Sequence, residues 1–135
     1  IKRNASTILE DQKKLNKHQM KNLMTLVNLV NPTIKILKSK EKNLNLIGIM
    51  LHKNWEIKRL MSKKITSKLI DRYYFKAIKA GASGGKILGA GNGGFFLFYV
   101  NEKNQRNFKN LFMSLKKLDF NFEKKGTTVV FNDQN

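Results

Sequence analysis

The order of its sequence patterns predicts an α+β fold for this chain of 135 residues. Apolar residues at helical spacing fill the first half, and short apolar or alternating runs typical of strands appear only after residue 80. Such segregation is typical of a small antiparallel sheet with helices packed on one face. A hydrophobic content of 41% suits one folded domain, which we expect to span 1–135.

Three helices are expected in the first half of the chain. The first ends near Pro32, because proline suits the first position of the next helix, over 33–38. A third helix is expected in 44–62. The apolar stripes of the first and third helices are Leu15, Leu23, Leu26, Val27 and Val30, and Leu44, Ile47, Leu51 and Trp55.

A fourth helix is expected over 70–80. Asp71 lies near its start, and Gly81 lies just past its end, where glycine can take the left-handed conformation that closes a helix. Its inner side consists of Tyr73, Tyr74, Ala77 and Ile78.

The last third of the chain changes to strand-like patterns. The wholly apolar 95–100 predicts a central strand, and Asn101 can cap the helix that follows. Segments 119–125 and 127–131 alternate on either side of Gly126 and predict a closing hairpin. The expected order is helices, then strand, strand, helix, strand, strand. The inner face of the last helix is expected to be Phe108, Leu111, Phe112, Leu115 and Leu118.

The composition excludes some classes of site. The chain has no cysteine and two isolated histidines, so thiolate and zinc sites are not expected. No apolar run approaches the ~20 residues of a membrane-spanning helix. We therefore expect a cytoplasmic protein without a membrane partner.

A net charge of +18 invites a nucleic-acid interpretation. However, the basic residues are spread from Lys2 to Lys125, and Lys, Asn and Ile are over-used together, as in an AT-rich genome. We therefore expect no nucleic-acid partner, and a basic nucleic-acid-binding module stays as the alternative function.

Seven of the nine glycines lie between Gly81 and Gly94. Residues 89–94 satisfy G-x-G-x-x-G, but the motif opens a strand instead of a helix, which excludes a dinucleotide fingerprint. The companion motifs of a protein-kinase glycine loop are absent. A Walker loop is excluded because Lys86 is followed by Ile87, which has no hydroxyl for magnesium.

With these three phosphate loops excluded, the backbone properties of glycine offer the remaining explanation of the stretch. Backbone amides without a Cβ can approach a ligand and form an anion-binding nest, and Lys86 adds a positive charge between the two glycine clusters. Close backbone packing explains one or two of the glycines but is a weak account of all seven.

The stretch "GASGGKILGAGNGGFFLFYV" resembles the third, C-terminal glycine motif of the GHMP small-molecule kinases. With "LHKNWEIKRLMSKKIT", "ID" and the early "ASTILEDQ", it looks like the heptose 7-phosphate kinase subgroup. Ser83 stands where a larger apolar residue is expected, and Asn92 stands where the subgroup has glycine. The matching positions are Gly81, Ala82, Gly84, Gly85, Lys86, Gly89, Ala90, Gly91, Gly93 and Gly94.

The resemblance implies the ferredoxin-like C-terminal domain of a two-domain sugar kinase. The N-terminal domain, absent from this sequence, would supply the nucleotide loop, most of the contacts to ATP and Mg, and the catalytic residues. A chain that starts at Ile1 without Met agrees with a piece of a longer protein. The isolated chain is therefore expected to be inactive, and its exposed apolar face to favour self-association.

The implied activity is phosphorylation of a heptose 7-phosphate at its anomeric hydroxyl, for heptose nucleotide and surface polysaccharide synthesis. Fucose, galactose or mevalonate as substrate, and a truncated non-catalytic remnant, stay open. The resemblance implies a phosphate and substrate loop made of Gly84, Gly85, Lys86, Gly89, Ala90, Gly91, Asn92, Gly93 and Gly94. Candidate contacts to the sugar phosphate are His52, Trp55, Lys58 and Arg59.

Overall fold

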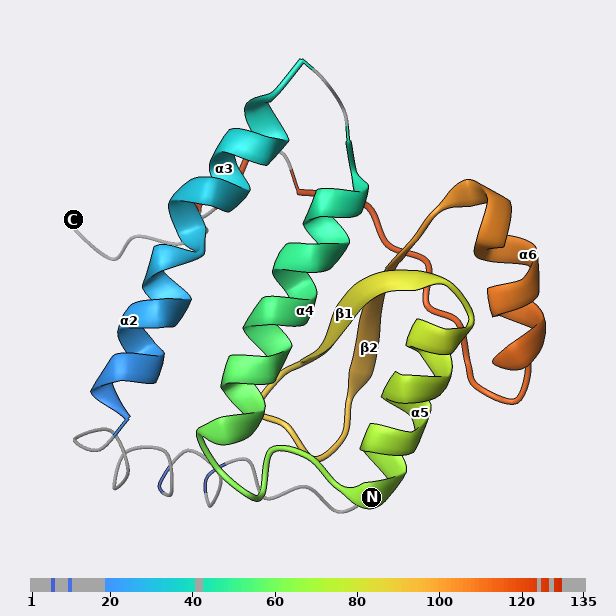
Figure 1. Cartoon of the computed structure of the whole chain (residues 1–135), viewed down its shortest axis with the longest axis horizontal. Coiled ribbons are helices and arrows are strands. Elements are labelled where there is room, and N and C mark those ends of the chain that lie inside the picture. Colours follow the sequence, from blue (N-terminus) through green and yellow to red (C-terminus); the bar gives the residue numbers. More distant parts are fainter. Residues whose placement is uncertain are drawn as a thin grey trace.

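The computed structural model describes residues 6, 10, 19–40, 43–123, 125–126 and 128–129. Helices come first and a hairpin follows, so the predicted α+β class is confirmed. In Figure 1 the hairpin lies between α4 and α5, with α2 and α3 beyond α4 and α6 beyond α5. The elements are α2 (Met20–Asn28), α3 (Val30–Lys38), α4 (Asn45–Leu60), α5 (Lys68–Lys79), β1 (Ala82–Leu88), β2 (Phe95–Val100) and α6 (Glu102–Leu111).

The break between the first two helices falls at Leu29, three residues before the predicted position. Pro32 is the third residue of α3, where no intrahelical partner exists for a backbone N–H, so proline costs nothing there. The Thr33 N–H still donates to the Leu29 carbonyl at 3.2 Å. As a result α2 and α3 follow each other almost as one rod along α4 (Figure 1). Leu15, the first residue of the predicted stripe, lies outside the described residues.

Helix α4 confirms the predicted third helix and lies very close to β1. Gly48 is buried at the contact, and a Cβ on it would lie 2.7 Å from the Ser83 Cβ and 3.2 Å from the Gly84 nitrogen. The Ser83 hydroxyl donates to the Asn45 side-chain oxygen at 3.0 Å. This contact between two backbones fixes where the hairpin sits on the helix.

Helix α5 also confirms its prediction. The Ser67 hydroxyl accepts from the Ile70 N–H at 3.3 Å, and Gly81, with φ +95°, follows the helix. Its buried residues Ile70, Tyr74 and Ala77 face the centre of the molecule. The core there consists of Trp55, Met61, Ile65, Ile70, Tyr74 and Ile87, with Leu23, Leu26, Ile78, Ala90, Phe96 and Phe98 packed against it.

Strand β2 confirms the predicted strand at 95–100, but its predicted central position is wrong for the described residues. It pairs there only with β1, antiparallel, with Gly85 opposite Phe98 and Lys86 opposite Leu97. Both strands are therefore edges of a two-stranded sheet. The six residues 89–94 connect them.

The helix after β2 is shorter than predicted. Asn101 caps α6 as expected, since its side chain accepts from the Lys103 N–H at 3.4 Å. Phe108 lies on the inner face, with its ring centroid 5.6 Å from that of Phe98. The helix ends at Leu111, and Leu111, Leu115 and Leu118 are 42%, 40% and 55% exposed, so their predicted inner positions are wrong.

The predicted closing hairpin is not formed by the described residues. Segment 113–123 contains no strand, and Phe120 and Phe122 are 60% and 87% exposed. Their rings contact each other, 5.7 Å apart, instead of a sheet. Alternation gives a segment two faces but no hydrogen-bonding partner, so it cannot form a strand alone. Most of the second predicted strand, 127–131, lies outside the described residues.

Candidate functional site at the glycine loop

The loop between the two strands, residues 89–94, has a backbone that favours glycine. Gly89, Gly91, Gly93 and Gly94 have φ between +101° and +138°, and Asn92 has φ +50°. Asparagine tolerates this left-handed region better than most residues, which is why Asn92 can stand among the glycines.

The loop is anchored to the turn before α5. The Asn92 N–H donates to the Ile65 carbonyl at 2.7 Å. A Cβ on Gly91 would lie 2.8 Å from the Ile65 Cα, so this position needs glycine for close packing as well as for its conformation. Ala90 packs against the core, whereas Gly89 and Gly94 are exposed. One side of the loop is therefore fixed and the other faces solvent.

The earlier glycines serve packing. Gly84 and Gly85 lie within β1 and are buried. A Cβ on Gly84 would collide with Gly48 and lie 2.8 Å from the His52 Cβ, and one on Gly85 would collide with Phe98. The glycine-rich stretch thus divides into a packing part in β1 and an open loop at 89–94.

Two lysines lie beside the start of this loop. Lys58, in the last turn of α4, donates from Nζ to the Gly89 carbonyl at 2.8 Å. Partial burial, and then the nearby charge of Lys86 on β1, lower the pKa of the Lys58 ammonium. Partial burial also lowers the pKa of Lys86. Two cations that repel each other and have lost part of their hydration form a favourable place for an anion.

The other candidate residues of α4 are already engaged. Arg59 contacts the carboxylates of Glu56 and Asp71 at 3.1 and 3.3 Å. Trp55 has no exposed surface and lies in the core. Arg59 is 22% exposed but paired with two carboxylates, and Trp55 is buried, so among the described residues Lys58 is the α4 candidate that contacts the loop near Lys86.

His52 belongs to a buried contact that the sequence did not indicate. Its Nδ1 lies 2.7 Å from the Tyr74 hydroxyl, and this hydroxyl donates to the Gly85 carbonyl at 3.2 Å. The hydroxyl therefore joins α4, α5 and β1 immediately behind the glycine-rich strand. The sequence indicated Tyr74 only as a core residue, and the anchoring carbonyl of Ile65 is backbone, which leaves no signal in a sequence.

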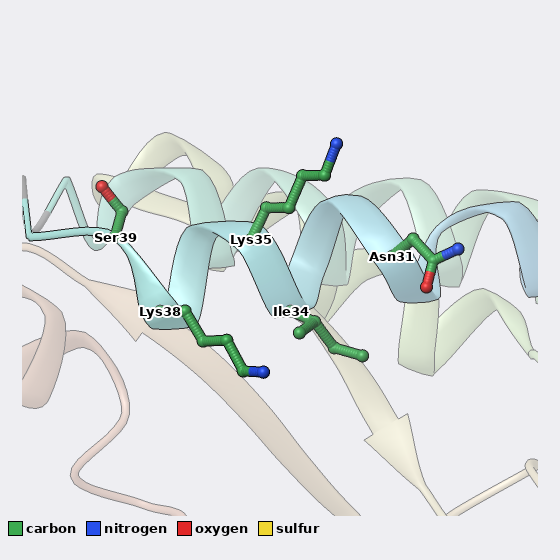
Figure 2. Close-up of a pocket in the computed structure, with 5 residues that line it drawn as sticks. All are labelled: Asn31, Ile34, Lys35, Lys38 and Ser39. Atoms are coloured by element: carbon green, nitrogen blue, oxygen red, sulfur yellow. The ribbon is translucent and has the colours of Figure 1, made fainter.

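A second surface feature lies apart from the loop. Figure 2 shows a hollow on α3 lined by Asn31, Ile34, Lys35, Lys38 and Ser39. The Lys35 side chain points away from Lys38 and Ile34, so these groups do not converge on one point. The hollow shares no residue with loop 89–94.

A comparison with solved structures finds a protein of similar fold. Mevalonate kinase of L. major, solved in complex with R-mevalonate, matches 84% of this chain with a TM-score of 0.69 at 16% sequence identity, over 35% of its own length. No profile of a known protein family matches the chain. The structural match shows the fold: the chain folds like part of this mevalonate kinase.

A curated protein matches in sequence. The D-glycero-alpha-D-manno-heptose 7-phosphate kinase of Campylobacter jejuni is 37% identical over 82 residues, which cover 57% of this chain and 23% of that enzyme. The chain thus corresponds to about a quarter of its length. The sequence and structural matches together show that this chain is a domain like the C-terminal domain of GHMP kinases.

Proposed function

We propose that this chain forms the substrate side of the active site of an ATP-dependent sugar kinase, which phosphorylates a heptose 7-phosphate. The observation that carries the proposal is the pair Lys58 and Lys86 beside the open side of loop 89–94. The similarity to the Campylobacter enzyme supports the choice of sugar. The anomeric hydroxyl is the proposed acceptor.

The role of the two lysines follows from the reaction. The sugar hydroxyl attacks the γ-phosphorus of ATP, its proton leaves, and the bond to ADP breaks, so catalysis requires alignment and neutralisation of the phosphoryl oxygens. The loop amides and the two ammonium groups are proposed to hold phosphate oxygens in place. A bound phosphate also offsets the repulsion between Lys58 and Lys86, so binding favours their charged forms.

Nucleotide, magnesium and proton transfer are assigned to a second domain. Among the described residues no group of three or more His, Cys, Asp or Glu side chains gathers around a metal position. None of the helices in the described part combines the length and the apolar character needed to cross a bilayer. We propose that the kinase acts in the cytoplasm, where ATP is available.

Substitution of either lysine in the full-length parent tests the site. Lys86→Ala and Lys58→Ala should each raise the KM for heptose 7-phosphate or lower kcat by about tenfold or more, because each removes a charged hydrogen-bond donor worth about 1.5–3 kcal/mol. Lys53→Ala, an exposed lysine of the same helix, is the matched control. If steady-state kinetics give unchanged kcat and KM for both variants, the two lysines do not form the proposed phosphate site.

The choice of sugar is tested in the same protein. Turnover with heptose 7-phosphate should exceed that with galactose, fucose or mevalonate by at least about tenfold, since only the phosphorylated sugar uses the two lysines fully. If an unphosphorylated substrate reacts faster, the proposal that the parent is a kinase stands, and the proposal that heptose 7-phosphate is its substrate is wrong.

The 135-residue chain alone should not transfer phosphate from ATP to the sugar phosphate. The proposed nucleotide loop and catalytic base belong to the other domain, so binding of the sugar would occur without chemistry. Phosphorylation by the isolated chain, measured as ADP release, would contradict the two-domain proposal.

A further inference from the structure

Helix α5 exposes a row of basic side chains. Lys68, Arg72, Lys76 and Lys79 are spaced four, four and three residues apart, which places them along one face over ~17 Å. All four are exposed. Phe75 falls within this row and is 54% exposed, although large aromatic side chains are usually buried.

Helix α6 lies beside this row and extends it. The Tyr73 ring of α5 is 6.4 Å from the Phe112 ring at the end of α6, and the Asn104 side chain donates to the Gly81 carbonyl at 3.3 Å. Figure 1 shows α6 next to the C-terminal end of α5. The exposed basic residues of α6 are Lys103, Arg106 and Lys109.

These charges are not neutralised locally. Within the part of the chain that the structure describes, none of the seven basic side chains forms an ion pair. Arg72 and Lys76 instead lie over aromatic rings, with Arg72 Cζ 6.0 Å from the Tyr73 ring and Lys76 Nζ 5.7 Å from the Phe112 ring. Basic groups interleaved with aromatic rings are typical of surfaces that bind nucleic-acid strands.

The gathering of basic side chains on α5 and α6 results from the fold and not only from the overall excess of lysine. The exposed residues of α4 are mostly apolar and include one lysine and one glutamate: Leu46, Ile49, Lys53, Glu56 and Leu60. A uniform excess of lysine would give each exposed helix face the same character. The α5–α6 side differs in number: α5 exposes four basic residues and α6 three, whereas α2 exposes only Lys21 and α3 only Lys35 and Lys38.

We propose that this basic face, defined as Lys68, Arg72, Phe75, Lys76, Lys79, Lys103, Arg106 and Lys109, binds single-stranded nucleic acid. The ammonium and guanidinium groups match the phosphates, and Phe75 offers a ring on which an unpaired base can stack. In a duplex the bases already stack on one another. A lipid surface requires a broad apolar face beside the charges, and α5 and α6 expose only Leu69 and Leu111 in addition to Phe75.

The binding test uses the 135-residue chain and a labelled single strand of about 16 nucleotides. Fluorescence anisotropy at about 50 and 200 mM salt gives the affinity and its salt dependence. Arg72→Gln/Lys76→Gln/Lys79→Gln should weaken binding at least about tenfold and flatten the slope of log K against log salt by about 2, at ~0.7 per lost phosphate contact.

The matched control removes the same charge elsewhere. Lys35→Gln/Lys38→Gln/Lys53→Gln replaces three exposed lysines of α3 and α4 and should change affinity by less than about threefold. If the two triple variants lose affinity equally, the strand is attracted to the charge of the whole chain. That result would contradict the proposal that the basic face is the binding site. Phe75→Leu should weaken binding about fivefold or more, and wild-type affinity would overturn the stacking.

Further measurements use the wild-type chain and distinguish a single strand from a duplex or a lipid vesicle as the ligand. Tighter binding to a duplex of the same sequence, or to phosphatidylserine vesicles, would overturn the single-strand assignment. Photo-crosslinking of the wild-type chain to the strand should label peptides from α5 and α6, and labels confined to other elements would contradict the proposal. None of these assays requires ATP or sugar, so they fail or succeed separately from the kinase proposal.

Discussion

Tyr74 is a residue whose role depends on three neighbours from different elements. Its ring contacts those of Trp55 and Phe98 in the core, with centroids 5.9 and 5.6 Å apart. Its hydroxyl donates to the Gly85 carbonyl at 3.2 Å and lies 2.7 Å from His52 Nδ1. Burial raises the pKa of Tyr74 from 10.0 to about 12. The phenol is therefore held in its neutral form.

This shift predicts how stability depends on alkaline pH. The unfolded tyrosine ionises near pH 10, whereas the folded one keeps its proton to about pH 12. Between these values the native state binds more protons, so stability is present below pH 10 and lost as pH rises. The free-energy difference between wild type and Tyr74→Phe should fall by about 2–3 kcal/mol across this range.

Urea denaturation at several pH values measures this difference. At neutral pH Tyr74→Phe should cost about 1–2 kcal/mol, because His52 and Gly85 lose a buried partner. Because Tyr74→Phe removes only this phenol, the difference between the two proteins isolates its contribution. A difference that stays constant from pH 8 to 12 would contradict the shift.

At the scale of elements, the position of the glycine loop depends on how α4 meets β1. Gly48 and Gly84 lie opposite each other with no room for a Cβ on either. Lys58, ten residues after Gly48 on α4, reaches the loop because the two elements run close together. The packing glycines thus control the distance between the lysine pair and the loop.

Gly48→Ala tests this contact. Alanine in a helix interior normally stabilises by about 1 kcal/mol relative to glycine. Here the new methyl would lie 2.7 Å from the Ser83 Cβ and 3.0 Å from the Ser83 carbonyl carbon, and overpacking of this kind costs about 1–3 kcal/mol. We expect a net loss of stability of up to about 2 kcal/mol in urea unfolding, since neither contact can rotate away. Lys53→Ala, exposed on the same helix, should change stability by less than about 0.5 kcal/mol. A stabilised Gly48→Ala variant would show that α4 and β1 do not meet as closely as described.

At the scale of the whole molecule, two opposite surface properties compete. The rod of α2 and α3 exposes an apolar stripe whose residues are each 42–64% exposed: Met20, Met24, Val27, Val30, Ile34 and Leu37. The net charge of +18 opposes contact between copies of the chain. Salt screens the charge but leaves the apolar stripe attractive.

Self-association of the chain should therefore increase with salt. Light scattering coupled to gel filtration should find monomers at about 0.01 M salt and dimers or larger species at about 1 M, where the Debye length falls from ~30 to ~3 Å. Val27→Lys should suppress the larger species, whereas Asn28→Lys adds the same charge on α2 outside the stripe and should not. A monomer at both salt concentrations would show that the stripe is too small to drive contact.

Much of the site could be predicted from the sequence, because local chemistry determines it. Positive φ values require glycine or asparagine, so the composition of 89–94 defines the loop wherever the rest of the chain lies. Helices α4 and α5 follow from apolar spacing and from Gly81 just past the end of α5, whereas the cap at Ser67 was found only in the structure. The resemblance to GHMP kinases depends on the same local motif.

Only the tertiary structure decided which side chains meet. Arg59 and Lys58 are adjacent in sequence, but Arg59 turns to Asp71 and only Lys58 reaches Gly89. Segment 119–125 alternates like a strand, yet the described part of it pairs with none. Ion pairs and strand pairs depend on partners distant in the chain. A sequence therefore shows what a residue can do locally, whereas the fold decides which partner it finds.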